Sequence, residues 1–283
     1  MAYNLSTLAK RNKEFRVITP SATMEGQLLR MYTPIIQGWR NGAALMMGMY
    51  AARDTDAIAQ EDENKDKEIA ALIALLLLRG YFTKVEAWHR AKWIANVKAA
   101  TGVDATWLVA QPELAGVGFR AATVGTEQGG IMAAARAART ATTQGGITTA
   151  INNATASALT QARSISQDAR NRIQNAIAGG MRVNAPVEDV ARDINEGLGK
   201  VRARAGRIAE NELDNAVKAM TDARMAEAEL DEAVWRHYTP KERARPTHLA
   251  RQGMRLKADD PRWNELMLPF CRCQKRPVLT VKK

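Results

Sequence analysis

Residues 235–273 read WRHYTPKERARPTHLARQGMRLKADDPRWNELMLPFCRC and contain both cysteines of the chain, two of its three histidines and two of its six tryptophans. The same end of the chain is strongly basic, because residues 236–283 carry 13 Lys and Arg against 4 Asp and Glu, a net +9 of the chain's total of +11. Residues 233–238 and 277–281 offer the β-favouring residues of two short strands. The stretch between them is divided by Pro240, Pro246, Gly253, Pro261 and Pro269. This pattern predicts a compact, loop-rich α+β module at the C-terminal end.

The rest of the chain has the composition of a helical protein. The 283 residues are 46% apolar but only 5% aromatic, and their abundant alanine favours helices over sheets. We therefore expect a mainly α fold, with a helical N-terminal region followed by the small α+β module. The composition shifts divide the chain into an N-terminal arm (1–20), a helical domain (21–115), an Ala/Thr/Gly-rich helical connector (116–180) and a C-terminal domain (181–283).

The helical domain is predicted to consist of several helices, including one in the methionine-rich stretch that follows Gly42. The first begins after Ser21 and is expected to bend or end at Pro34. Another contains the apolar run 69–78, closes at Arg79-Gly80 and, being apolar on nearly all sides, is expected at the centre of the core. The last covers 83–101 and stops at Gly102. Residues 1–20 are expected to form an extended arm that becomes ordered against a partner.

The connector has small side chains throughout, and its Gly129-Gly130 and Gly145-Gly146 pairs predict breaks between helices. Its alanine-rich face leaves two interpretations open: packing against another protein, or packing along the neighbouring domain. A capping Asn184 followed by Pro186 and two acidic residues predicts a helix start. That helix is expected to end near Leu198, and a second one to cover 201–228.

The cysteines and histidines of the terminal stretch raise the question of a metal site. Cys271 and Cys273 together with His248, and His237 as a further candidate, supply the sulfur and nitrogen ligands that zinc accepts. The alternative is structural: His248 holds loops by hydrogen bonds and the cysteines are small buried apolar groups. A thiol–histidine catalytic pair has no evident orienting third residue, so we expect no enzyme activity. His89 is expected to be structural or exposed to solvent.

The basic residues of the terminal stretch suit phosphate and carboxylate partners equally well. Contacts with DNA or with an acidic protein are predicted for Arg251, Arg255, Arg272, Lys275 and Arg276. The chain carries no helix-turn-helix or zinc-finger pattern, so a nucleic-acid role would be nonspecific. Its glycines follow no phosphate-binding pattern. The N-terminus lacks a signal-peptide layout, and the longest apolar run is too short to span a bilayer, so we expect a soluble protein without membrane contact.

The terminal stretch resembles the phage Mu F-like head morphogenesis proteins, which are minor head proteins of tailed bacteriophages. The resemblance covers about residues 180–283. It rests on an ordered set of residues, which comprises Trp235, Arg243, Arg245, His248, Gly253, Asp259, Asp260, Pro261, Trp263, Cys271 and Cys273. It implies a virion component of the head interior or portal vertex, assembled in the host cytoplasm, with structural or docking roles for these residues. The implied partners are the portal protein, the major capsid protein, genomic DNA bound nonspecifically, and further copies of the chain itself.

Overall fold

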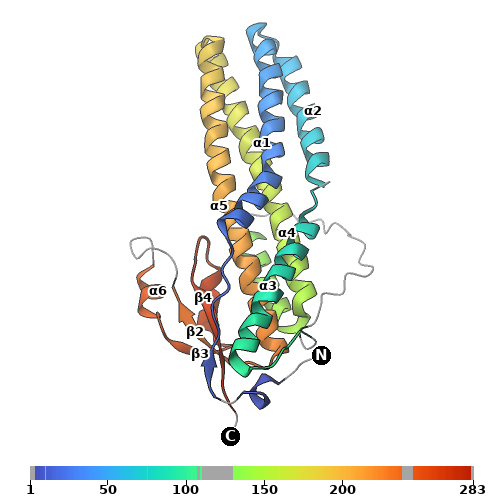
Figure 1. The fold of residues 1–283 in the computed structure, drawn as a ribbon. Helices are drawn as coiled ribbons and strands as arrows, with labels where there is room; N and C mark the ends of the chain where they lie inside the picture. The colour runs from blue at the N-terminus through green and yellow to red at the C-terminus, as the bar shows by residue number, and fades with distance from the viewer. Residues whose placement is uncertain are drawn as a thin grey trace. The chain divides into compact units, whose positions relative to one another are not determined.

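The computed structural model describes residues 4–9, 11–74, 76–106, 109, 130–237 and 245–281, and of residues 130–145 it describes the backbone alone. The helices are α1 (Ala22–Ala51), α2 (Thr55–Ala74), α3 (Leu78–Thr101), α4 (Gly130–Val183), α5 (Val187–Glu227) and α6 (Pro246–Ala250), with short 3-10 helices η1 (Leu5–Thr7) and η3 (Pro261–Met267) (Figure 1). The strands are β1 (Lys13–Glu14), β2 (Glu232–Arg236), β3 (Arg255–Lys257) and β4 (Gln274–Leu279). The fold is mainly α with a small antiparallel sheet, which confirms the predicted class.

The chain folds into two compact units that are each built from separated stretches. Unit 1 contains residues 1–20, 79–155 and 211–283, and unit 2 contains residues 21–78 and 156–210. Helices α4 and α5 each contribute residues to both units. The predicted segments 1–20, 21–115, 116–180 and 181–283 are consecutive, and their capacity to fold as separate domains stays a prediction.

Unit 2 is a helical bundle in which a few buried side chains form hydrogen bonds from one helix to another. Trp39 on α1 is fully buried, and its indole Nε1 donates to Ser166 Oγ on α4 at 2.8 Å. The hydroxyl of Tyr32, also on α1, donates to the Ala158 carbonyl oxygen. Because these aromatic residues are amphipathic, they fill the core while their polar tips satisfy partners on α4.

The alanine-rich face of α4 is buried within the chain itself. In unit 2 the buried hydrophobic residues of α4 recur at helical spacing, and they are Ala158, Ala162, Ile165, Ala169, Ile173 and Ile177. Arg170, beside this face, donates to Asp62 Oδ2 and Asp66 Oδ2 on α2, both at 2.7 Å. Of the two interpretations of the connector, packing against the neighbouring part of the same chain therefore holds for the described residues.

Unit 1 contains the sheet and the helical segments that cover it. The described strands form one antiparallel sheet in the order β1-β4-β2-β3, with Lys13 opposite Leu279 and Ala233 opposite both Pro277 and Leu256. Residues 12–20 of the N-terminal arm are thus extended as predicted, whereas Leu5–Thr7 form η1, and the strand that orders the arm is β4 of the same chain. Phe15 packs edge-on against Trp93 of α3, and the Asn96 side chain bonds both the amide and the carbonyl of Arg16. These contacts fix the arm on unit 1.

The helical domain differs from the predictions in two places. Helix α1 does not end at Pro34 but continues to Ala51, while a bend at Pro34 stays a prediction. Pro34 and Arg30, whose carbonyl it frees, are both exposed, so water can satisfy that carbonyl. The apolar run 69–78 is not one buried helix, since α2 ends at Ala74 and α3 begins at Leu78. Only Ile69, Ile73 and Leu78 of this run are buried among the described residues, and Leu77 is 79% exposed.

The predicted helix boundaries farther along the chain had mixed outcomes. The stop at Gly102 and the start near Pro186 are confirmed. A kink at Gly146 is confirmed by its φ of 62°, a left-handed conformation that suits glycine. The predicted break between Leu198 and Val201 was wrong, because α5 is continuous from Val187 to Glu227. Across the described residues, no helix combines the length and hydrophobicity needed to cross a bilayer.

Candidate functional site

The terminal stretch converges on two stacked tryptophans in unit 1. Trp235 lies on β2 and is fully buried, and its ring stacks on Trp263 of η3 with centroids 5.4 Å apart and planes 11° apart. His248 of α6 meets the edge of the Trp235 ring at a centroid distance of 5.3 Å. Three segments that prolines and a glycine separate in the sequence are therefore held together by one aromatic cluster.

Several other residues on which the resemblance rests shape the turns around this cluster. Gly253 adopts a φ of 84°, and its amide donates to the Trp235 carbonyl, so a side chain at this position would be strained. Asp260 caps η3 by accepting from the Arg262 amide, and Pro261 occupies the first turn. The hydrogen bonds from Arg262 lower the pKa of Asp260 to about 2. The indole Nε1 of Trp263 donates to the Lys257 carbonyl at 2.6 Å.

A cluster of two thiols and an imidazole lies against the tryptophans. His248 Nδ1 is 3.3 Å from Cys271 Sγ and 3.5 Å from Cys273 Sγ. All three side chains are buried, and their ligand atoms lie within 4.8 Å of one another. Both cysteines are free thiols. The structure thus brings together the three residues that the sequence singled out as candidate metal ligands.

The other ring nitrogen of His248 faces a carboxylate. His248 Nε2 is 3.4 Å from Glu265 Oε2, and the same carboxylate oxygen forms an ion pair with Arg251. The Arg251 guanidinium lies over the Trp235 ring, 5.4 Å from its centroid. Hydrogen bonding to Arg251 lowers the pKa of Glu265, so Glu265 is a carboxylate at neutral pH. The imidazole is therefore oriented with one nitrogen towards the thiols and the other towards a negative charge.

His237, at the end of β2, borders the cluster without completing it. Its Nδ1 is 3.1 Å from Cys273 Sγ, and its backbone amide donates to Gln252 Oε1 at 2.7 Å. The buried Nε2 of His237 has no hydrogen-bond partner. The described group whose ligand atoms all lie within 4.8 Å of one another does not include His237.

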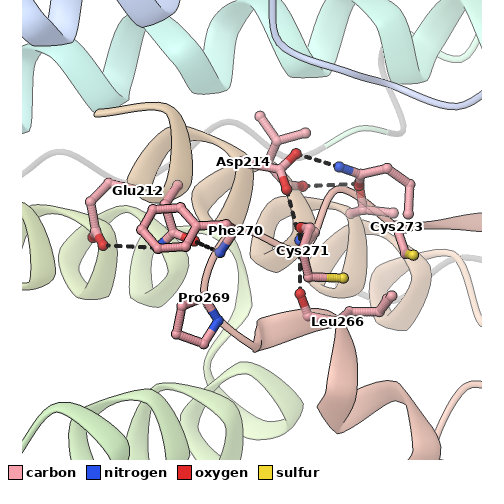
Figure 2. Close-up of polar contacts among 12 residues, drawn as sticks. Glu212, Asp214, Leu266, Pro269, Phe270, Cys271 and Cys273 are labelled. Carbon is pink, nitrogen blue, oxygen red and sulfur yellow. Dashed lines mark hydrogen bonds and ion pairs between the residues drawn. The ribbon is translucent and has the colours of Figure 1, made fainter. Parts of the chain in front are cut away.

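A buried lysine on α5 holds the chain segment that carries the cysteines. Lys218 Nζ donates to the carbonyl oxygens of Leu266 and Cys271, at 2.8 and 2.5 Å. It also pairs with Asp214 Oδ2 at 2.7 Å, and Asp214 Oδ1 accepts a further hydrogen bond from the side-chain Nε2 of Gln274 (Figure 2). Sequence reasoning missed Lys218, Asp214 and Glu265. The spacing of Asp214 and Lys218 indicates an ion pair on a helix, but nothing in it indicates burial.

The two thiols interact directly. A hydrogen bond from Cys273 lowers the pKa of Cys271, and the same hydrogen bond together with burial raises the pKa of Cys273. Cys271 is therefore the thiol that becomes a thiolate first. Lys218 favours the ionised form of both. Thiolate and imidazole are the groups that coordinate zinc.

Most of the basic residues of the terminal stretch have partners within unit 1. Arg255 pairs with Glu232, Lys275 with Asp222, and Arg276 with Glu14, while Arg245 donates to the Pro269 carbonyl. Arg272 also has an interaction partner. Arg243 lies outside the described residues. Asp259 lines a cleft of about 230 Å³ between α5 and η3, together with Asp222 and Lys275.

His89 lies away from the terminal stretch in sequence and has a structural role. It is fully buried on α3, with Nε2 3.1 Å from Thr221 Oγ1 on α5. Because Thr221 donates its own hydroxyl to the Val217 carbonyl, the Nε2–H of a neutral His89 is the donor to Thr221. Burial, together with the nearby Arg224 charge, lowers the pKa of His89 to about 3.

Comparison with known proteins supports the resemblance seen in the sequence. No curated protein and no solved structure matches the chain significantly. One protein family does match, over a range that includes the last third of α4, all of α5 and the terminal stretch almost to the end of β4. Residues 167–276 match the family described as Phage Mu protein F like protein, the family whose motif the terminal stretch resembles.

Proposed function

We propose that the chain is a minor head protein of a tailed bacteriophage that acts in head morphogenesis as a structural component and not as an enzyme. The observation that carries the proposal is the family match over residues 167–276. The site supports it, because the matched residues form a packed cluster around Trp235 and Trp263. Their geometry is that of a rigid module, with buried side chains bonded to one another.

In this proposal the terminal module docks on the portal protein or on the inner surface of the major capsid protein. Its rigidity supports a docking role, since a preorganised surface loses little conformational freedom on binding. One exposed feature suits a partner: Phe270 is 56% exposed and adopts a φ of 60°, and its amide donates to Asn211 Oδ1 at 2.8 Å. An aromatic side chain held on a fixed turn is a typical interface anchor.

The helical unit 2 would contact other head components, the DNA or further copies of the chain. Unit 2 also exposes an apolar residue, Leu45 on α1, which is 55% exposed. Roles in DNA packaging or ejection belong to the same proposal, because a protein at the portal lies on the path of the genome.

The alternative is a nonspecific nucleic-acid-binding protein that neutralises phosphates with its basic terminal stretch. Four of the five residues predicted to contact DNA or an acidic partner, Arg251, Arg255, Lys275 and Arg276, form ion pairs with carboxylates of unit 1. Each phosphate contact would have to replace such a pair. This favours docking over phosphate neutralisation as the main role. The alternative requires an affinity for DNA that falls steeply as salt rises.

Quantitative mass spectrometry of purified phage particles, with and without their DNA, tests the proposal. A few copies per particle that remain in empty heads are the expected result. Presence only in full heads would replace portal docking with a DNA-bound or ejected role. Absence from both would contradict a role as a virion component.

Substitution of the exposed anchor tests the docking surface separately. Phe270→Ser is expected to lower the number of copies per particle while the purified protein keeps its unfolding midpoint. Leu77→Ser changes an exposed apolar residue that the proposal assigns to no partner, and this control is expected to leave incorporation unchanged. Equal incorporation of both variants at the wild-type level would contradict docking through Phe270.

A further inference from the structure

We propose that His248, Cys271 and Cys273 bind a structural zinc ion, with His237 as the fourth ligand. The inference stands on the geometry of these side chains and does not depend on the proposed role in the phage head. Zinc in structural sites is bound by four protein ligands in a tetrahedron, and two Cys with two His is one of its common ligand sets.

The separations of the ligand atoms fit the edges of such a tetrahedron. With zinc–sulfur bonds of about 2.3 Å and zinc–nitrogen bonds of about 2.0–2.1 Å, a sulfur and a nitrogen in one tetrahedron lie roughly 3.6 Å apart. The His248 Nδ1 atom lies 3.3 Å from Cys271 Sγ and 3.5 Å from Cys273 Sγ. The two sulfur atoms also lie within 4.8 Å of each other, so small shifts of the side chains suffice to bring all three atoms to bonding distance of one ion.

The surroundings of His248 provide an independent indication. A histidine that binds a metal through one nitrogen usually donates its other N–H to a carboxylate or carbonyl, which fixes its tautomer and orientation. His248 Nε2 is buried without a hydrogen bond and lies 3.4 Å from Glu265 Oε2, and Arg251 forms an ion pair with that carboxylate in turn. With zinc on Nδ1, the N–H of the imidazole is on Nε2, on the side of this carboxylate.

His237 is the described side chain placed to close the fourth position. Its Nδ1 already contacts Cys273 Sγ at 3.1 Å, and its Nε2 is buried without a hydrogen bond. Because His237 is close to Cys273 but does not belong to the group whose ligand atoms all lie within 4.8 Å of one another, binding requires its side chain to move closer to the other two ligands. The backbone of His237 stays in place through its bond to Gln252.

Charge balance favours a divalent cation in this cluster. The ion replaces the two thiol protons, which are released to solvent, and two thiolates with Zn²⁺ form a neutral group. Lys218 does not neutralise a dithiolate by itself, because its charge is already paired with Asp214 at 2.7 Å. Sulfur and imidazole ligands select zinc over magnesium or calcium, which prefer oxygen.

The ion would add a direct link between three segments of the module that lie apart in the sequence. His237 follows β2, His248 lies on the five-residue α6, and both cysteines precede β4. Small, loop-rich modules commonly gain their stability from such a metal, and binding energy then becomes folding energy.

Metal analysis of the purified full-length chain is the direct test. The protein is expressed in zinc-supplemented medium, kept reduced, dialysed against zinc-free buffer and analysed for metal per chain. One zinc per chain is expected. Replacement of zinc by Co²⁺ is expected to give the thiolate-to-cobalt charge-transfer band and the visible absorption of tetrahedral coordination. A wild-type chain that retains neither ion, with both thiols freely reactive, would overturn the proposal, as would a Cys271–Cys273 disulfide.

Substitutions of single residues and of the two cysteines together test which side chains bind the ion. The double substitution Cys271→Ser and Cys273→Ser is expected to abolish zinc binding, and His237→Asn to weaken it. Glu265→Gln removes no ligand but is expected to lower zinc affinity by about 10- to 100-fold. His89→Gln changes the other buried histidine of unit 1 and is expected to leave the zinc content at one per chain. Zinc retained by the double cysteine variant would place the metal elsewhere and overturn the assignment. Where that variant fails to fold, the cobalt spectra of wild type, Glu265→Gln and His237→Asn decide.

Discussion

Glu86 on α3 and Arg224 on α5 form a fully buried ion pair, with Arg224 Nη2 2.5 Å from Glu86 Oε1 and both side chains at most 1% exposed. Arg224 also donates to Glu227 Oε2 at 2.6 Å. Without Arg224, the buried Glu86 carboxylate keeps only a longer contact with Arg90 at 3.9 Å, and removing one partner of a buried pair costs about 3–5 kcal/mol. We expect Arg224→Met to lower the free energy of unfolding by that amount, measured by urea denaturation.

The double variant provides the control for this pair. Glu86→Leu combined with Arg224→Met removes both charges, and a buried pair replaced by apolar residues is often close to neutral. The double variant is therefore expected to be more stable than Arg224→Met alone. Strictly additive losses would show that the two side chains are not coupled.

His89 predicts a pH dependence of stability. Its pKa is about 3 in the folded protein and about 6.5 when unfolded, so only the unfolded state takes up the proton between these values. Stability contributed by neutral His89 is complete above pH 6.5 and is lost as pH falls towards 3, by at most about 1.4 kcal/mol per pH unit. His89→Gln keeps a donor for Thr221 and cannot be protonated, so its unfolding midpoint should fall less over this range.

The difference in stability between the wild-type chain and His89→Gln reports on His89 alone, because the carboxylates titrate in both proteins. At pH 7 to 8 the two should differ by a constant amount, and the difference should shrink or reverse as pH falls. Parallel profiles from pH 7 to pH 3 would contradict a buried, neutral His89.

The parts of the fold predicted from sequence were those with local signals. The strands expected at 233–238 and 277–281 overlap β2 and β4, and the Gly145-Gly146 pair marks the kink in α4. Pairing of β1 with β4 could not be predicted, since it joins residues more than 260 positions apart. The predicted break near Gly197 failed because this glycine lies within α5 against Arg172, where its missing side chain permits close packing.

Close packing of helices in unit 2 depends on Gly180. A Cβ at this position would lie 2.4 Å from Val190 Cγ2 and 2.7 Å from the Tyr50 hydroxyl. We expect Gly180→Ala to destabilise the protein by about 1–3 kcal/mol through overpacking. The adjacent Gly179 has open space around its Cβ direction, so Gly179→Ala should stabilise by up to about 1 kcal/mol through helix propensity.

Thermal unfolding of the two alanine variants gives a matched comparison, since they differ by one position on the same helix. Opposite signs of the change in Tm are expected. A stabilising Gly180→Ala would show that α4 and its neighbours separate without cost at this position.

The candidate site was predictable in its ligands but not in its support. Cysteine and histidine are rare in this chain, so His248, Cys271 and Cys273 stood out by type alone. Lys218 and Asp214 did not, because charged residues four apart on a helix are usually exposed. Their burial follows from the packing of α5 against the η3–β4 segment, which is set by tertiary contacts.

Substitution of Lys218 is expected to lower the free energy of unfolding more than substitution of any other charged residue that contacts the terminal module. Lys218→Met leaves the buried Asp214 carboxylate without its cation and removes the donor from the Leu266 and Cys271 carbonyls, for an expected loss of about 3–5 kcal/mol. Lys200, on the same helix, pairs with Glu196 at the same spacing but is exposed, so Lys200→Met should leave the urea midpoint nearly unchanged. Adding Asp214→Asn to Lys218→Met removes the unpaired charge and should recover part of the loss. If Lys218→Met and Lys200→Met had the same small effect, the lysine would not hold the cysteine segment on α5.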